Sequence, residues 1–167
     1  MGSPKLDFRN VYDHKTWVVL YANALGYQEK FLAYCEDYAN RTEFPNLDVE
    51  IQQFVSGGMF SKERTNMLSC TFHDSTFKSL GIYFRAQQFG NVLIYSLLKC
   101  VERGLWDKVT GTNIVAKLAH IRDSCKNMAQ WEEFDSLQSL GDLIFVNAMK
   151  EFDPSYKENR TLLDRLP

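Results

Sequence analysis

The sequence predicts an all-α fold, a single-domain helical bundle of five to seven helices. The stretch from Gly81 to Gly104 has apolar side chains almost all the way round a helix, and such a helix has to be enclosed by its neighbours. We therefore expect a buried central helix near residues 81–103. Apolar residues at helical spacing recur on both sides of it. We find no Asn-Gly or Asp-Gly hairpin turn between alternating runs, the pattern that indicates paired strands.

The length of 167 residues fits one domain. The apolar content of 45% and the charged content of 24% are close to the averages of folded proteins, so we expect a core that needs no metal or disulfide. Residues 1–12 are expected to form an irregular lead-in, in which Gly2-Ser3-Pro4 fits a cloning remnant. The helical domain is expected over residues 13–153. Residues 154–167 read as a polar tail with a short helical turn.

Four helices are expected in the first half of the chain, over residues 13–25, 28–40, 47–55 and 62–70. Gly26 ends the first helix, Phe44-Pro45-Asn46 breaks the chain after the second, and Gly57-Gly58 ends the third. The segment from Val18 to Tyr21 has the composition of a strand, but its flanks favour a helix. The loop after the fourth helix is expected over residues 71–76, which are rich in side chains that compete with helical hydrogen bonds.

Three longer helices are expected in the second half, near residues 81–103, 113–129 and 136–152. Glycine inside a helix costs about 1 kcal/mol relative to alanine, so Gly90 predicts a close crossing of two helices. Thr112 is expected to cap the second of these helices. Asp153-Pro154 ends the third, because the residue before a proline disfavours helical dihedral angles.

The net charge, the apolar runs and the cysteines argue against a nucleic-acid binder, a membrane protein and a secreted protein. A net charge of −2 argues against a general nucleic-acid binder, which usually has a basic excess. The longest apolar run is well short of the roughly 18–20 residues that cross a bilayer, and the first residues do not resemble a secretory signal. The four cysteines form no CxxC pair, which indicates buried free thiols. We therefore expect an intracellular, cytoplasmic protein without a membrane segment.

The motifs of metal and enzyme chemistry are incomplete in this sequence. Cys70-x-x-His73 has the spacing of half a zinc site. His120 and Cys125 do not supply the other half, because two residues five apart on an expected helix point in different directions. A GxSxG nucleophile elbow and a phosphate-binding glycine loop are also missing. We name no catalytic, cofactor-binding or metal-binding residue and no cofactor, and the sequence leans away from an enzyme.

Aromatic residues make up 14% of the chain and gather in the first two expected helices. Tyrosine and tryptophan at the edge of a core also populate the energetic centres of protein interfaces, although a purely structural role competes with this interpretation. The predicted function is a non-enzymatic helical interaction domain, which binds another protein or a second copy of itself through an aromatic and apolar surface. The candidate partner-binding residues are Trp17, Tyr21, Tyr27, Phe31, Tyr34 and Tyr38.

Two alternatives stay open. The first is nucleic-acid binding, because a polar helix face with several basic residues can contact phosphates, although Asp107 and Asp123 dilute its charge. The second is an enzyme of unrecognised type, in which a cysteine or a carboxylate meets a histidine in a cleft. The candidate nucleic-acid-binding residues are Lys108, Lys117, Arg122 and Lys126.

Overall fold

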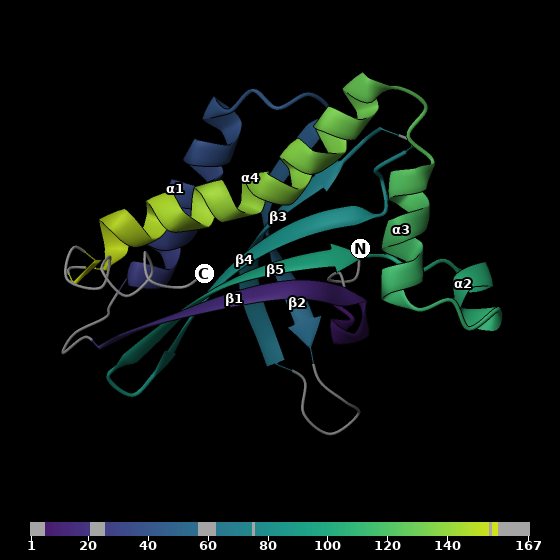
Figure 1. Ribbon diagram of the computed structural model, residues 1–167. Helices are drawn as coiled ribbons and strands as arrows, with labels where there is room; N and C mark the ends of the chain where they lie inside the picture. The colour runs from purple at the N-terminus through teal and green to yellow at the C-terminus, as the bar shows by residue number, and fades with distance from the viewer. Residues whose placement is uncertain (1–5, 21–25, 57–62, 75, 154, 157–167) are drawn as a thin grey trace.

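The prediction of an all-α helical bundle is wrong, because the chain forms a mixed α/β fold around one five-stranded antiparallel sheet (Figure 1). The computed structural model describes residues 6–20, 26–56, 63–74, 76–153 and 155–156. The strands lie side by side in the order β1-β5-β4-β3-β2. They are β1 (Val11–Leu20), β2 (Leu47–Ser56), β3 (Glu63–Phe72), β4 (Leu80–Phe89) and β5 (Val92–Val101).

Helices cover one face of the sheet, which we call the helix face. α1 (Tyr27–Arg41) and the long α4 (Met128–Phe152) lie next to each other across it (Figure 1). α2 (Leu105–Val109) and α3 (Ile114–Asp123) connect β5 to α4 at one end of the sheet, and a short 3-10 turn, η1 (Phe8–Asn10), precedes β1. Among the described helices, none is both long and apolar enough to cross a membrane. We call the opposite side of the sheet the open face.

The expected central helix at residues 81–103 is a β-hairpin made of β4 and β5. Phe89 pairs with Val92, and Gly90-Asn91 forms the two-residue turn between them. Gly90 has a φ of +58°, so it serves a tight turn and not a helix crossing. Most residues of the two strands are buried whichever face they point to. A strand buried on both faces reads as a continuous apolar run, which explains why the segment resembled an enclosed helix.

Three other expected helices are also strands. Residues 13–25 contain most of β1, and residues 47–55 and 62–70 correspond to β2 and β3. β2 and β3 pair along their whole length, from Leu47↔Phe72 to Ser56↔Glu63. These hydrogen bonds join two separate segments of the chain, and a short window of helical spacing does not reveal them.

The remaining helices are confirmed with shifted ends. α1 covers the expected segment 28–40, and α3 covers the first part of the expected segment 113–129. The cap of α3 is Asn113 instead of Thr112, and its side chain accepts a hydrogen bond from the Ala116 N–H. α4 begins at Met128, before the expected start, and ends at Phe152 as expected.

The expected lead-in and the expected tail are described only in part. The expected irregular lead-in of residues 1–12 contains η1 and the start of β1. Most of the expected tail of residues 154–167 lies outside the described residues, apart from Ser155 and Tyr156.

The main core lies between the helix face and the two long helices. Phe31 of α1 and Tyr95 of β5 are fully buried there, with their ring centroids 4.7 Å apart. Gly141 lets α4 approach the sheet closely, because a Cβ atom at this position would lie 3.0 Å from Ile82 Cγ2 and 3.1 Å from Leu97 Cδ1. Packed side chains therefore fill the contact between α4 and the centre of the sheet.

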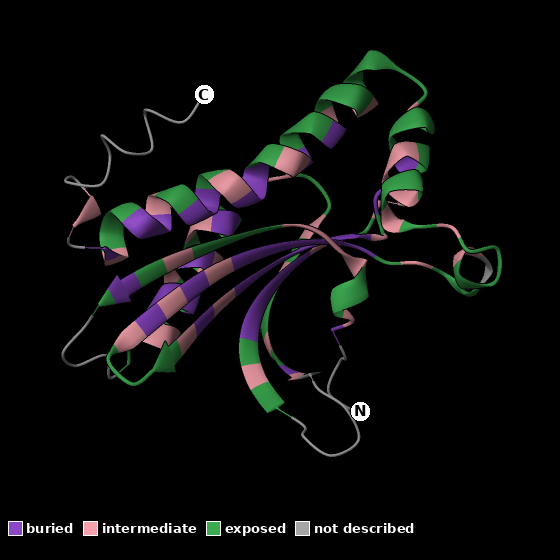
Figure 2. Cartoon of the chain, turned by 60° about the horizontal axis from the view of Figure 1, so that its bottom comes forward, coloured by how far each residue is buried: buried purple, intermediate pink, exposed green. Residues whose placement is uncertain are grey.

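A second, smaller core covers part of the open face. Leu6, which precedes β1, packs there against the strands, so the open-face side chains of this cluster are buried. The half near the β4–β5 turn lies beyond this cluster (Figure 2). The cluster consists of Leu6, Phe54, Met67, Tyr83, Leu98 and Cys100, with Val11 packed against it.

Candidate protein-binding surface

β3 and β4 separate partway along their length. Their pairing runs from Thr71↔Gly81 to Leu68↔Phe84 and stops there. β2 stays paired with β3, and β5 stays paired with β4, so the sheet opens into two hairpins that splay apart (Figure 2). We call the space between residues 63–67 of β3 and residues 85–89 of β4 the fork.

Main-chain groups of β4 point into the fork. The Glu102 N–H donates to the Ser79 carbonyl at 2.7 Å, in the same register as the pairing of β4 with β5. Successive residues of an antiparallel strand direct their main-chain groups to opposite sides, so the odd-numbered residues of β4 face β5 and the even-numbered residues face away. Ala86 and Gln88 therefore present their N–H and C=O groups to the fork.

The facing edge of β3 follows the same rule. The His73 N–H donates to the Asn46 carbonyl at 2.9 Å, in the register of the β2–β3 pairing. The odd-numbered residues of β3 therefore face β2, and the even-numbered residues face β4. Asn66 and Arg64 present their main-chain groups to the fork.

The ladder between the two strands thus stops two hydrogen-bonded pairs early. If it continued in register, Ala86 would pair with Asn66, and Gln88 would pair with Arg64. Neither pair forms in the part of the chain that the structure describes. Two strand edges whose main-chain N–H and C=O groups do not pair with each other therefore face the fork. Such edges can form hydrogen bonds with a strand of another chain.

A cavity of about 330 Å³ lies in the fork beneath the first turns of α1. Leu32 of α1 and Ala86 of β4, both buried, form an apolar part of its lining. The carboxamide side chains of Gln28, Gln53 and Gln87 lie around them. α1 therefore closes the fork on the helix face, over a lining that combines an apolar base with hydrogen-bonding groups.

A carboxylate bridges the fork. Oε1 of Glu63 accepts hydrogen bonds from Nη2 of Arg85 at 2.8 Å and from Nε2 of Gln87 at 2.9 Å. The side chain of Glu63 is half exposed, whereas that of Arg85 is 18% exposed. The buried Nε of Arg85 has no hydrogen-bond partner among the described residues. A buried donor without an acceptor costs about 1–3 kcal/mol, so Arg85 retains an unused binding capacity.

Apolar side chains lie next to the fork on the half of the open face near the β4–β5 turn. Val19 and Leu93 are buried under the helices, so their neighbours along each strand point to the open face. Cross-strand pairing brings these neighbours together, and three of them are strongly exposed: Leu20 (79%), Val18 (58%) and Phe89 (55%). We call this group the hairpin-end patch; it consists of Val18, Leu20, Phe89, Val92 and Ile94.

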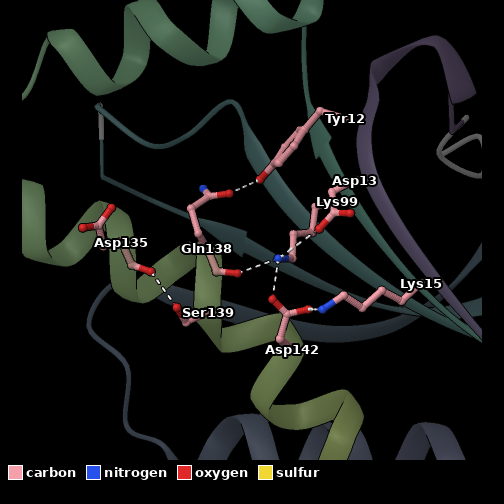
Figure 3. A network of polar contacts seen from close by, with 8 residues as sticks. All are labelled: Tyr12, Asp13, Lys15, Lys99, Asp135, Gln138, Ser139 and Asp142. Carbon is pink, nitrogen blue, oxygen red and sulfur yellow. Dashed lines mark hydrogen bonds and ion pairs between the residues drawn. The ribbon is translucent and has the colours of Figure 1, made fainter. Parts of the chain in front are cut away.

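A polar cluster around the buried Lys99 lies elsewhere, between α4 and strands β1 and β5 (Figure 3). Lys99, whose side chain is 5% exposed, donates to Oδ2 of Asp142 at 2.8 Å and to the Gln138 carbonyl at 2.7 Å. Its Nζ also lies 3.3 Å from Oδ2 of Asp13. Lys15 pairs with the other oxygen of Asp142 at 2.6 Å.

The charges of this cluster compensate one another. Burial raises the pKa of Asp142, but hydrogen bonds and charges from Lys15 and Lys99 outweigh that effect and hold the pKa below 3.8. Tyr12 donates to Oε1 of Gln138 at 2.7 Å, and burial raises the pKa of its hydroxyl. Paired charges between a strand and a helix indicate an anchor that orients α4 on the sheet, not a reactive site.

The candidate aromatic residues occupy different places. Phe31 is fully buried in the core. The indole of Trp17 on β1 donates to Oδ2 of Asp153 at 2.7 Å and stacks on Tyr156. Tyr21 lies outside the described residues.

The three tyrosines of α1 are half-buried against the main core: Tyr27, Tyr34 and Tyr38. The Tyr34 ring contacts both the Tyr38 ring and the Phe152 ring of α4. Tyr38 also accepts a hydrogen bond from Asn147 at 3.2 Å. The structure thus places the rings of Tyr34 and Tyr38 at the junction of α1 and α4, apart from the hairpin-end patch.

The candidate basic residues lie around α2 and α3. Lys117 pairs with Asp107 at 2.9 Å, and this hydrogen bond lowers the pKa of Asp107. Arg122 pairs with Asp123 at 3.2 Å and lies over the ring of Trp131. The other two residues, Lys108 and Lys126, are exposed.

The Cys70–His73 half-site is not assembled. Cys70 is buried, whereas His73 is exposed and its Nε2 lies 2.6 Å from Oδ2 of Asp48. Among the described residues, no group of three or more His, Cys, Asp and Glu side chains could hold a metal ion. All four cysteines are free, and Cys35 and Cys100 are also buried.

The residues of the fork and of the hairpin-end patch were missed at the sequence level. The available signal was Gly90-Asn91 between two ten-residue apolar runs, a pair that also indicates a hairpin turn. Recognition of that turn would have placed Phe89 on a strand. The point where β3 leaves β4 has no comparable local signature.

Comparison with known proteins identifies no family for this chain. Neither a family model nor a curated protein matches the chain. Among solved structures, it is similar to the protein TTHA0849 from Thermus thermophilus, with 9% sequence identity and a TM-score of 0.25. The alignment covers 80% of this chain and 97% of that chain. A likeness this weak carries no weight for fold or function.

Proposed function

We propose that this protein is a non-enzymatic interaction domain, which binds another polypeptide at the hairpin-end patch. The observation that carries the proposal is the contiguity of Val18, Leu20 and Phe89, three strongly exposed side chains on the part of the open face near the β4–β5 turn. Single exposed apolar residues are ordinary on protein surfaces, whereas a cluster of them marks an interaction site.

Hydrophobic burial supplies the driving force for this binding. Removal of apolar surface from water contributes roughly 25 cal/mol per Å², so covering three large side chains yields several kcal/mol of gross free energy before the costs of association. The patch is made of paired strands and needs no rearrangement to form. We place this interaction in the cytoplasm, in agreement with the free state of all four cysteines.

The two alternatives gain no support of the same kind. Lys117 and Arg122 have acidic partners, which reduce the charge available for phosphates. An enzymatic function lacks a described cluster that joins a nucleophile to a base.

Site-specific photo-crosslinking tests the proposal. A photoreactive phenylalanine analogue at position 89 is expected to give one discrete protein adduct in an extract of the source cells. The same analogue at Val115, which is 71% exposed on α3, serves as the matched control and should not give that adduct. Leu20→Lys should abolish the adduct at position 89. If both positions give the same adducts, or if Leu20→Lys changes nothing, the proposal is wrong.

A further inference from the structure

We propose that the fork takes up an extended segment of the partner as an added β-strand along β4, with an acidic side chain of that segment on Arg85. This inference rests on the proposed function, and it names the form in which the partner is bound. It follows from three independent features: the main-chain groups in the fork, the cavity under α1, and the unused donor of Arg85.

An extended main chain is the ligand that complements a strand edge. Ala86 and Gln88 each present an N–H and a C=O at the spacing of alternate strand residues, and Asn66 and Arg64 do so from the other side. A peptide in β conformation offers the same alternation of donors and acceptors. Addition of a strand to an open edge is an established mode of peptide recognition, in which main-chain hydrogen bonds supply affinity.

The two faces of the fork then select side chains. Successive side chains of an added strand point to opposite faces of the sheet. On the helix face they enter the cavity of about 330 Å³, where Leu32 and Ala86 offer an apolar base. The carboxamides of Gln28 and Gln53 lie beside this base, so this side of the segment should carry an uncharged residue. On the open face, the segment lies beside Arg85 and continues toward Phe89 of the hairpin-end patch.

Glu63 acts as an internal substitute for the acidic residue of the partner. It holds Nη2 of Arg85 at 2.8 Å, but the buried Nε of the same guanidinium has no acceptor among the described residues. A carboxylate can accept two parallel hydrogen bonds from a guanidinium, a geometry that is stronger and more specific than one bond. A carboxylate supplied by the added strand can therefore displace Glu63, which is half exposed and anchored at one oxygen.

Peptide selection supplies a defined probe for this inference. A library of short linear peptides displayed on phage is selected against the intact protein, and the enriched peptide is synthesised for calorimetric titration. We expect enriched sequences to carry an Asp or Glu that alternates with an uncharged residue. A selection that enriches no peptide, or peptides without an acidic residue, overturns the inference.

Substitutions of Arg85 and of Glu63 should change the affinity for the selected peptide in opposite directions. Arg85→Gln should weaken binding of the selected peptide about tenfold, because a charge-assisted pair is lost. Glu63→Gln should strengthen it severalfold, because the competing charge on Arg85 is removed. Glu132→Gln, which removes the same charge from an exposed position on α4 away from the fork, should leave the affinity nearly unchanged. If the Arg85–Glu63 pair were merely structural, both variants would weaken binding, and that result would refute the inference.

Main-chain pairing is tested at Gln88. Gln88→Pro removes an N–H that faces the fork and leaves the hydrogen bonds of β4 with β5 intact, since those come from odd-numbered residues. We expect it to abolish peptide binding, whereas Gln88→Ala should preserve it. If the proline variant does not fold, N-methylation of alternate peptide bonds in the ligand tests the same hydrogen bonds, and retained affinity contradicts strand addition.

The crosslink and the peptide selection together distinguish a failure of strand addition in the fork from a failure of binding at the hairpin-end patch. If the crosslink from position 89 persists in Gln88→Pro and no peptide is selected, the hairpin-end patch binds a partner but the fork does not take up a strand. If the crosslink itself is absent from wild type, the proposed function fails first.

Discussion

Leu68 of β3 and Phe84 of β4 form the last cross-strand pair before the two strands separate. Both side chains are fully buried. This pair therefore joins the continuous part of the sheet to the fork, and the packing of the two residues fixes where the fork begins. The unused ladder positions and the cavity under α1 both lie beyond it.

Phe84→Ala should destabilise the protein by about 3–5 kcal/mol, because it removes a fully buried ring and leaves a cavity. Phe89→Ala on the same strand should cost within about 0.5 kcal/mol, because Phe89 is 55% exposed. Urea unfolding followed by circular dichroism measures both. Equal losses in the two variants would contradict the assignment of Phe89 to an exposed patch.

Asp142→Asn should destabilise the protein by about 1–3 kcal/mol at neutral pH, since the buried charge of Lys99 then loses its closest carboxylate partner. The effect is expected near the low end of this range, because the Asp142 side chain is 32% exposed and solvent screens the pairs. Thermal unfolding of the two proteins measures the difference.

The difference between wild type and Asp142→Asn should depend on pH. The pKa of Asp142 is lower in the folded protein than its ordinary value of 3.8, so its stabilising effect is present above that value and is lost as the pH falls through the folded pKa. We therefore expect the two stabilities to converge below about pH 4. A difference that stays constant into this acidic range would show that the ion pairs contribute nothing.

Trp17→Phe should lower the stability by about 1–3 kcal/mol, because Asp153, a buried residue, loses the hydrogen bond from the indole. Val18→Ala, at the neighbouring exposed position, is the control and should cost far less. If Trp17→Phe keeps full stability and instead abolishes the crosslink from position 89, Trp17 is a partner-binding residue, as the sequence alone predicts.

Cysteine reactivity tests the burial of the core. Burial raises the pKa of Cys70 and of Cys100 to about 12, and it raises that of Cys35 well above the ordinary range. Cys125 is only half-buried. We expect a thiol reagent at mildly alkaline pH to modify Cys125 first and the other three only after unfolding. Cys125→Ser should abolish the rapid reaction; rapid reaction that survives in this variant would contradict the burial of the remaining thiols.

The helices that could be predicted from the sequence are those with one buried stripe. In α3, Ile114, Leu118 and Ile121 recur at helical spacing because one side faces the core and the other faces water. The central strands could not be predicted because both of their faces are buried over part of their length. Tyr83 and Leu98 are buried on the open face while their neighbours are buried under the helices, so this half of β4 and β5 shows no alternation.

The candidate site could not be predicted from the sequence for a different physical reason. The prediction of a protein-binding surface remains a proposal, but the residues proposed for it moved from the aromatic rings of α1 to the strands. The positions of Ala86 and Gln88 matter because β3 leaves β4 before reaching them. That separation is a tertiary feature that no local spacing encodes. Glu63 and Arg85 likewise meet only after the two strands have folded together.

Amide hydrogen exchange along β4 is the most direct measurement, because it reads the main-chain groups on which strand addition depends. In the free protein, the amides of Arg85 and Gln87 should exchange slowly, since they face β5, while those of Ala86 and Gln88 should exchange much faster. Addition of the selected peptide should slow the exchange of the Ala86 and Gln88 amides and leave the exchange rates of the other two amides unchanged. Uniform protection of all four amides in the free protein, or no change on peptide addition, would contradict the account.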